Sequence, residues 1–205
     1  MEISVKIINI FNIDNNDLDI IKSKMPIRYS EINNIKNENV KKTKLATLLH
    51  MINNLNCSEE DIIYNKYNKP MLKNNNKYFN ISNAGDISLY VEDDCEIGID
   101  IEEIDEKNID IKNYAFNENE ILYIDKNQID NIHLLWTRKE AFVKMLGTGF
   151  IEKPSDLKVD FCIKGELNDI VNFNGDIYYL ITKKYKNYYI SICSKHKYDS
   201  IKIIY

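Results

Sequence analysis

Seven consecutive residues, Glu96-Ile97-Gly98-Ile99-Asp100-Ile101-Glu102, alternate between β-branched apolar side chains and small or acidic ones. Successive side chains of a β-strand point to opposite faces, so the three isoleucines share one face and Gly98, Asp100 and Glu102 share the other. β-Branched residues favour strands that pack on a core. The stretch therefore predicts a half-buried strand with its isoleucines inward and its two acids on the opposite, wet face.

Asp100 and Glu102 stand two positions apart, which places them roughly 6.5 to 7 Å apart along a strand. Side chains of their length can converge on one cation from that spacing. Gly98 beside them leaves room for a ligand to approach the backbone. Solvated strand faces commonly carry acids as well, so the stretch alone leaves metal binding and plain exposure both open.

The composition is that of a globular protein with a substantial core: 205 residues, 44% hydrophobic, 29% charged, with a formal net charge of -5. Negative net charge disfavours nucleic acid as a partner, and no apolar run is long enough for a membrane span. With no signal peptide expected, we predict a cytoplasmic protein with reduced thiols. The cysteines lie far apart, without a Cys-x-x-Cys pair or a nearby histidine, which disfavours zinc; they are Cys57, Cys95, Cys162 and Cys193.

The first half of the chain is expected to be mixed helix and strand. Apolar alternation predicts strands over residues 2–10, 62–64, 78–82 and 87–91. Helices are expected over 17–24, stopped before Pro26, and over 38–55. Residues 66–76 are expected to form a loop and 83–86 a turn. The acids at 92–94 predict a tight turn, so that strands 87–91 and 95–101 pair as an antiparallel hairpin.

The second half is expected to follow the same plan. Residues 117–120 could start a helix over 121–124, and Asp130 is a good N-cap for a helix that runs to Leu146 and ends at Gly147. Strands are expected over 157–161, 177–182, 188–193 and 201–205. Each half thus combines strands with one principal helix, although no sequence repeat relates them.

A second constellation lies within the predicted helix, at Trp136-Thr137-Arg138-Lys139-Glu140-Ala141-Phe142-Val143-Lys144. Glu140 and Lys144 are four residues apart in the favourable order for a helical ion pair, which alone would be a minor surface contact. Thr137 and Glu140 could instead form a capping box, but the apolar face extends further upstream. Trp136 and Phe142 are most simply core residues.

Together the two constellations resemble the paired signature of the 4′-phosphopantetheinyl transferases, of the Sfp (surfactin synthetase-activating) type. The family forms are G-[I/V]-D-x-E and, later in the chain, W-[S/T/C]-x-K-E-[S/A]-x-x-K. Other blocks resemble the family in the same order: Asn68-Lys69-Pro70, Phe79-Asn80-Ile81-Ser82, Phe116 with Glu120, and Gly147-Thr148-Gly149-Phe150. The family usually has His after F-N-I-S, where this chain has Asn83, which cannot add positive charge.

The resemblance implies an α+β fold made of a pseudo-two-fold pair of similar halves, residues 1–97 and 98–205, with the active site in the cleft between them. It implies that Asp100, Glu102 and Glu140 hold Mg²⁺, with Mn²⁺ as an alternative, in the second half. It implies that the first half receives the adenine and 3′-phosphate of coenzyme A. The coenzyme A contacts expected from it are Arg28, Lys42 (or its neighbours Lys41 and Lys44), Lys69, Pro70, Ser82, Asn83 and Lys144.

The activity implied is transfer of 4′-phosphopantetheine from coenzyme A to a serine of an acyl or peptidyl carrier protein, of the secondary-metabolism type. Glu140, Lys144 and Glu120 are the expected catalytic residues, with Glu140 itself or a water held by Glu120 taking the serine proton. A monomer is expected, with the carrier protein docking along residues 111–124. A Mg²⁺-dependent pyrophosphate hydrolase and a non-catalytic protein that binds coenzyme A or the carrier are the alternatives.

Overall fold

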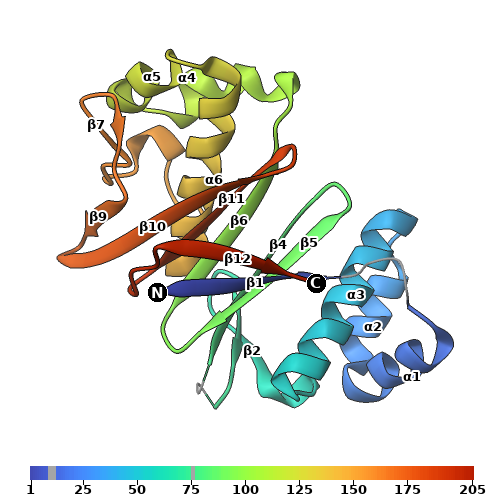
Figure 1. Cartoon of the computed structure of the whole chain (residues 1–205). Helices are drawn as coiled ribbons and strands as arrows, with labels where there is room; N and C mark the ends of the chain where they lie inside the picture. Colours follow the sequence, from blue (N-terminus) through green and yellow to red (C-terminus); the bar gives the residue numbers. More distant parts are fainter. Residues whose placement is uncertain (9–12, 75–76) are drawn as a thin grey trace.

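The computed structural model describes residues 1–8, 13–74 and 77–205, which form two four-stranded sheets with helices gathered on each (Figure 1). Residues 9 and 10 of the first predicted strand and residues 75 and 76 of the predicted loop lie outside the described residues. The α+β fold class is confirmed. No described helix is both long and apolar enough to cross a bilayer.

The first sheet has the strand order β12-β1-β5-β4. Its members are β1 (Glu2–Ile8), β4 (Tyr78–Ala84), β5 (Ile87–Asp93) and β12 (Ser200–Ile204). Strands β4 and β5 form an antiparallel hairpin that turns through Gly85, whose φ of +53° suits glycine. Strand β12 comes from the end of the chain and runs parallel to β1. The first sheet thus contains strands from both ends of the sequence.

The second sheet is antiparallel throughout, in the order β6-β11-β10-β9. It consists of β6 (Ile97–Glu103), β9 (Ile170–Phe173), β10 (Asp176–Tyr185) and β11 (Tyr188–Ser194). Two small ribbons complete the strands: β2 (Ile62–Tyr64) with β3 (Pro70–Leu72), and β7 (Cys162–Ile163) with β8 (Glu166–Leu167). Because β6 is an edge strand, one side of its backbone is available to the first half of the chain.

Helices α1 (Asn15–Lys24), α2 (Pro26–Asn33) and α3 (Glu38–Leu55) accompany the first sheet. Asp14 and Asn37 cap α1 and α3 with side-chain oxygens. The second sheet carries α4 (Lys112–Ala115), α5 (Glu118–Ile124) and the long α6 (Gln128–Leu146). In the part of the chain that the structure describes, three 3-10 helices link these elements: η1 (Glu59–Asp61), η2 (Glu106–Ile111) and η3 (Pro154–Asp156).

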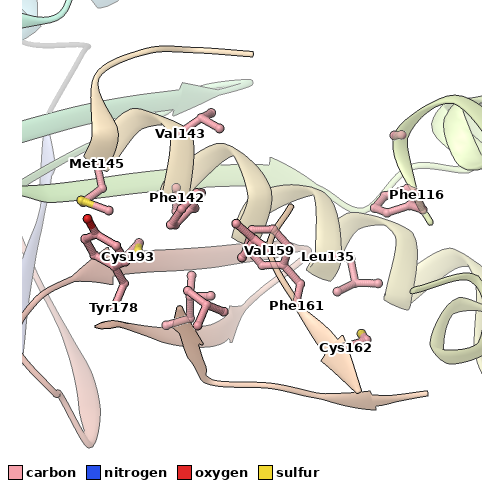
Figure 2. Close-up of a cluster of buried hydrophobic side chains, with 14 of the residues drawn as sticks. Phe116, Leu135, Phe142, Val143, Met145, Val159, Phe161, Cys162, Tyr178 and Cys193 are labelled. Atoms are coloured by element: carbon pink, nitrogen blue, oxygen red, sulfur yellow. The ribbon is translucent and has the colours of Figure 1, made fainter. Parts of the chain in front are cut away.

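Helix α6 anchors the core of the second half (Figure 2). The ring of Phe142 lies edge-on to three aromatic rings at centroid distances of 5.5 to 5.7 Å, those of Phe161, Phe173 and Tyr178. Such edge-to-face contacts add to the stabilisation from burial. The prediction that Phe142 is a core residue is confirmed, and its ring contacts fix the helix against β9 and β10.

A separate core lies between the two sheets and contains the isoleucine face of β6. Ile97, Ile99 and Ile101 are at most 2% exposed, and they pack with residues of β1, β5 and β11. The prediction for this face is confirmed. The opposite face is not the wet surface that alternation alone suggests, because α6 packs against it and buries Gly98 and Asp100.

Several predicted elements are wrong. Strands β5 and β6 belong to different sheets and do not form the predicted hairpin, since the acidic connection carries the chain from one sheet to the other. Residues 157–161 form no strand. Pro26 does not merely stop a helix but begins α2, which the sequence reasoning missed. Helix α6 begins at Gln128 rather than at an Asp130 cap, and Asn83 lies within β4 rather than in a turn.

Candidate active site

The candidate site forms where β4, β6 and α6 meet. Two side chains of β4 satisfy the free backbone edge of β6: the Ile99 amide donates to Asn80 Oδ1 at 2.9 Å, and the Ile101 amide donates to Ser82 Oγ at 3.4 Å. Buried backbone donors require such partners. The F-N-I-S block therefore joins the two halves directly beside the two acids of β6.

Gly98 brings α6 onto β6 at very short range. A Cβ atom at this position would lie 2.0 Å from the Ala141 carbonyl oxygen and 2.3 Å from the Met145 amide nitrogen. The glycine thus makes room for the helix backbone. The interpretation that Gly98 leaves space for a ligand is wrong, because helix α6 fills that space.

A cavity of about 400 Å³ opens at this junction. Its polar lining residues are Ser82, Asn83, Asp100, Glu102, Glu140 and Lys144. The structure thus gathers predicted residues from β4, β6 and α6 around one space. Glu140 and Lys144 share a face of α6 because they lie one helical turn apart.

Lys144, Asp100 and Ser82 form a closed triangle of contacts. Lys144 Nζ lies 2.6 Å from Asp100 Oδ1 and donates to Ser82 Oγ at 2.9 Å, while Ser82 Oγ donates to the same Asp100 oxygen at 2.9 Å. The second carboxylate oxygen, Asp100 Oδ2, is buried and has no hydrogen-bond partner. A buried carboxylate oxygen without a partner is costly, so this atom is suited to a cation.

The pKa of each of the three carboxylates is raised, in each case mainly by burial. Burial raises the pKa of Glu102 to about 7, and the charges of Asp100 and Glu140 add to the effect. A hydrogen bond from Trp136 and the charge of Lys144 oppose it. Burial also raises the pKa of Asp100 and of Glu140. Among the described residues that line it, the cavity contains three carboxyl groups and only one cationic side chain, Lys144, to balance their charge.

These residues fit a hard divalent cation such as Mg²⁺, which takes oxygen ligands. The donor set is all carboxylate, and one buried oxygen lacks a partner. In this structure the carboxylate oxygens of Asp100, Glu102 and Glu140 do not all lie within 4.8 Å of one another, the spacing expected of ligands to one ion. Lys144 instead occupies one side of Asp100.

A second cavity of about 300 Å³ adjoins the first, and both are lined by Ile81 and Asn83. It lies between α2, α3 and the first sheet and is also lined by Arg28, Lys44, Tyr64 and Pro70. Arg28 Nε donates to the Tyr64 hydroxyl at 2.9 Å, and the guanidinium pairs with Glu59. The cavity offers cationic groups beside apolar walls.

Among the three neighbouring lysines, the structure favours Lys44 over the predicted Lys42. Lys44 lies on the same face of α3 as Thr47, Leu48 and Met51, and all four line the second cavity. Lys42 is exposed and does not line the cavity, because it lies on another face of the helix.

Two predicted site residues lie apart from both polar cavities. Lys69 Nζ donates to the Met145 carbonyl at 2.8 Å, at the end of α6, and burial lowers its pKa to about 8. Glu120 is fully buried, and its Oε2 lies 2.8 Å from Lys139 Nζ. Both side chains are thereby committed to interior contacts, so the structure does not bring them to the site.

The sequence reasoning missed Asn80 as a bridge between the halves and assigned Trp136 to the core alone. Trp136 is in fact half-buried, stacks on Phe150, and lines a cavity together with Glu102. An indole N–H needs an acceptor when it approaches the interior, which is the signal that could have placed Trp136 beside an acid.

Comparison with known proteins gives a family match over the segment that contains β6 and α6. Residues 96–193 match the model of the 4′-phosphopantetheinyl transferase superfamily, and this segment contains β6 and α6 with all three carboxylates and Lys144. This segment, just under half of the chain, is therefore similar to the 4′-phosphopantetheinyl transferase superfamily. The resemblance found in the motifs is thus confirmed.

Two individual 4′-phosphopantetheinyl transferases are similar over a longer stretch than this segment, and a third over a shorter one. The chain is 29% identical over 150 residues to the 4′-phosphopantetheinyl transferase gsp of Aneurinibacillus migulanus, covering 69% of this chain and 61% of that protein. It is 27% identical over 137 residues to the 4′-phosphopantetheinyl transferase Sfp of Bacillus subtilis, covering 64% of this chain and 61% of that one. The psf-1 transferase of Bacillus pumilus is 35% identical over 77 residues, which is 35% of this chain and 33% of the relative. The matches to gsp and Sfp thus span about three fifths of the length of each relative.

Proposed function

We propose that this protein transfers the 4′-phosphopantetheine group of coenzyme A to a serine hydroxyl of an acyl or peptidyl carrier protein. The observation that carries the proposal is the contact of Lys144 with Asp100 and Ser82 in a cavity that also contains Glu102 and Glu140. A cationic side chain and several carboxylates around one space suit a pyrophosphate that arrives with a divalent cation.

Asp100, Glu102 and Glu140 would hold the cation, Mg²⁺ in the first instance and Mn²⁺ as an alternative. When bound, that ion supplies neutralisation of the pyrophosphate charge. The orphaned Oδ2 atom of Asp100 supports a ligand role for this residue. Trp136 would act as a positioning residue in this arrangement, because it lies beside Glu102 in the wall of one cavity.

Lys144 would contact an oxygen of the pyrophosphate and stabilise the charge that develops on the leaving group. Its ammonium is half-buried and reaches the cavity from the last turn of α6. Ser82 and Asp100 hold it there through two short contacts. Preorganised charge of this kind is the main contribution that a protein makes to phosphoryl transfer.

The adenosine part of coenzyme A would occupy the second cavity, which adjoins the first at Asn83. Arg28 and Lys44 supply positive charge there for the 3′-phosphate, and Asn83 can donate a hydrogen bond to it. Pro70 and Ile81 offer apolar contact to the adenine. This arrangement supports the earlier expectation for Arg28, Pro70 and Asn83.

The serine proton requires an acceptor, for which we propose Glu140. Its carboxylate lines the cavity, whereas Glu120 is enclosed in an interior ion pair. The serine oxygen forms a bond to the β-phosphorus as its proton passes to Glu140. The bond from that phosphorus to the bridging oxygen breaks, and adenosine 3′,5′-bisphosphate leaves with the electron pair.

We propose that the carrier protein docks along residues 111–124, where Tyr114 and Leu122 expose large apolar side chains. Ile111, at the start of this segment, lines a further cavity together with Glu102 and Trp136. A secondary-metabolism carrier, a cytoplasmic location and a monomeric state complete the proposal, with neither nucleic acid nor membrane as a partner.

Mass spectrometry of a carrier protein incubated with this protein, coenzyme A and Mg²⁺ tests the proposal. The carrier should gain the mass of one phosphopantetheine group. Asp100→Ala and Asp100→Asn should abolish the gain, while Glu103→Ala, an exposed acid on the same strand, should preserve it. Circular dichroism of each variant verifies folding.

Two outcomes would overturn the transferase assignment. Release of adenosine bisphosphate without modified carrier would identify a hydrolase. Binding of coenzyme A with neither product would identify a non-catalytic protein. Transfer at the wild-type rate by folded Asp100→Ala would refute the role of Asp100.

A further inference from the structure

A group of metal-ligating side chains lies away from the candidate active site, where two connections between the sheets meet. Asp93 ends β5 and Cys95 follows in the link to β6, while His196 lies between β11 and β12. Cys95 precedes Asp100 by five residues, a separation on the order of 15 Å for extended chain. The group is therefore separate from the proposed cation site.

The ligand atoms of this group already have the spacing of a metal site. Among the described residues it is the one set of three such side chains whose ligand atoms all lie within 4.8 Å of one another. Asp93 Oδ2 lies 3.4 Å from Cys95 Sγ, and Asp93 Oδ1 lies 3.1 Å from His196 Nδ1. Tetrahedral zinc with bonds of about 2.0 to 2.3 Å separates its ligands by roughly 3.3 to 3.8 Å. Because the ligand atoms lie within 4.8 Å of one another, shifts of roughly 1 Å would bring them to these separations.

The types of ligand distinguish this group from the carboxylate cluster. A thiolate and an imidazole are ligands of zinc-class ions, whereas Mg²⁺ prefers oxygen alone. The four cysteines are free, so the Cys95 thiol is not consumed by a disulfide. The wide spacing of cysteines and histidines along the sequence disfavours zinc. The fold nevertheless brings Cys95 and His196 close together, although they are about a hundred residues apart in the chain.

Neighbouring groups hold the carboxylate of Asp93 in place. Its side chain is 8% exposed, and its Oδ2 accepts hydrogen bonds from the Tyr198 hydroxyl at 2.6 Å and the Ser194 hydroxyl at 3.1 Å. Such outer hydrogen bonds are the usual means of orienting a metal ligand. The His196 side chain is 44% exposed, which provides a route from solvent.

We propose that Asp93, Cys95 and His196 bind a zinc-class divalent cation, with water as the fourth ligand. Binding forms a bond from the Cys95 sulfur to the metal, and the thiol proton leaves to solvent. The ion would cross-link the β5–β6 connection to the β11–β12 connection. Its role is structural stabilisation of the junction between the sheets.

Titration of the metal-free, full-length protein with Co²⁺ in excess Mg²⁺ tests this site. Mg²⁺ saturates oxygen ligands, and Co²⁺ reports a thiolate ligand by a near-ultraviolet charge-transfer band and tetrahedral geometry by visible bands. One equivalent should bind, and Zn²⁺ should displace it. Zn²⁺ should also raise the thermal midpoint in proportion to the logarithm of its concentration.

Variants identify the ligands. Cys95→Ser keeps a hydroxyl for the local hydrogen bonds and should eliminate the thiolate band. His196→Gln should weaken Zn²⁺ binding more than about 100-fold, because losing an outer partner alone costs 10- to 100-fold. Cys57→Ser removes a thiol from the core of the first half and should leave the band unchanged.

Two results would overturn the proposal. One is the lack of stoichiometric binding by the folded wild-type protein, which would mean that the three side chains make hydrogen bonds only. The other is undiminished binding by folded Cys95→Ser or His196→Gln. Because all readouts are spectroscopic or thermal, they are independent of transferase activity.

Discussion

Gly98 of β6 and Ala141 of α6 meet backbone to backbone, so closely that a Cβ atom on Gly98 would lie 2.0 Å from the Ala141 carbonyl oxygen. Asp100 lies two residues after Gly98 on β6, and Lys144 lies three residues after Ala141 on α6. The contact of the two backbones therefore determines how near the carboxylate and the ammonium can approach. The 2.6 Å separation of Lys144 and Asp100 depends on a residue that itself lies outside the cavity lining.

Gly98→Ala should consequently destabilise the protein by more than about 3 kcal/mol, since backbone atoms cannot move aside as a side chain can. Denaturant unfolding measures the change. Gly175→Ala is the control, because nothing lies within 4 Å of its Cβ position and only the positive φ of +87° opposes alanine, at about 1 to 2 kcal/mol. Equal losses for the two variants would contradict the close-packing argument.

Lys44→Ala should raise the KM for coenzyme A about five-fold with little change in kcat, because it removes one charge from the wall of the second cavity. Lys42→Ala is the matched control and should have no effect, since Lys42 is exposed outside the cavity. With 3′-dephospho-coenzyme A, the Lys44→Ala effect should disappear. Sensitivity at Lys42 alone would place the phosphate on the other face of α3.

Lys139→Met should cost about 3 to 5 kcal/mol of unfolding free energy, because it leaves the carboxylate of fully buried Glu120 without its partner. Lys139 Nζ also donates to the Ala115 and Pro154 carbonyls at 2.8 Å, so the loss includes two structural hydrogen bonds. Denaturant unfolding of both single variants and of Lys139→Met with Glu120→Gln gives the coupling between them.

Glu120→Gln separates a structural role from a catalytic one. The transfer rate per folded molecule should stay within about two-fold of wild type, as expected for a group that touches no reacting atom. A 100-fold lower kcat in a fully folded Glu120→Gln protein would instead restore this residue to the catalytic set. Circular dichroism supplies the folded fraction for the comparison.

His50 predicts a pH dependence of stability. Burial and the nearby Lys6 ammonium lower the pKa of His50 from 6.5 to about 4, with Glu92 opposing, and its buried Nε2 has no hydrogen-bond partner. Between pH 6.5 and 4 the unfolded chain binds a proton that the folded chain does not. The free energy of unfolding should therefore fall as the pH falls through that window.

His50→Gln should flatten that acid limb relative to wild type, measured by denaturant unfolding at intervals from pH 8 to pH 4 in metal-free buffer. The edge contact of His50 with Tyr90, at 4.8 Å between ring centroids, is lost in the variant, so its stability near pH 8 should be somewhat lower. Parallel pH profiles would show that His50 is not the titrating group.

The hydrophobic periodicity of the sequence predicted much of the fold, because it indicates which face of a single helix or strand is buried. The isoleucines of β6 and the spacing of Glu140 and Lys144 on α6 correctly gave the face on which each residue lies. Pairing between elements is a different matter. The acids after β5 look like a hairpin turn, yet β6 pairs with β11, while Asn80 and Ser82 hydrogen-bond its other edge. Nothing local in residues 92–95 distinguishes these outcomes.

The site residues show the same limit. Lys42 and Lys44 differ by two positions, so they face different sides of α3, and sequence does not reveal how the helix is rotated toward the cavity. Lys69 and Glu120 matched family blocks but make interior contacts. A motif match identifies a residue type at a position, and only the packing shows whether that side chain faces the cavity.

The parallel pairing of β1 with β12 has a consequence for how the protein is made. Glu2 pairs with Ser200 and Lys6 with Ile204, so β1 can form this pairing only after residues nearly two hundred positions later have been synthesised. At about 5 to 20 residues per second, β1 has one edge unpaired for roughly 10 to 40 s on the ribosome. Throughout that interval the nascent chain exposes an open sheet edge, the kind of surface on which chaperones and aggregating neighbours compete.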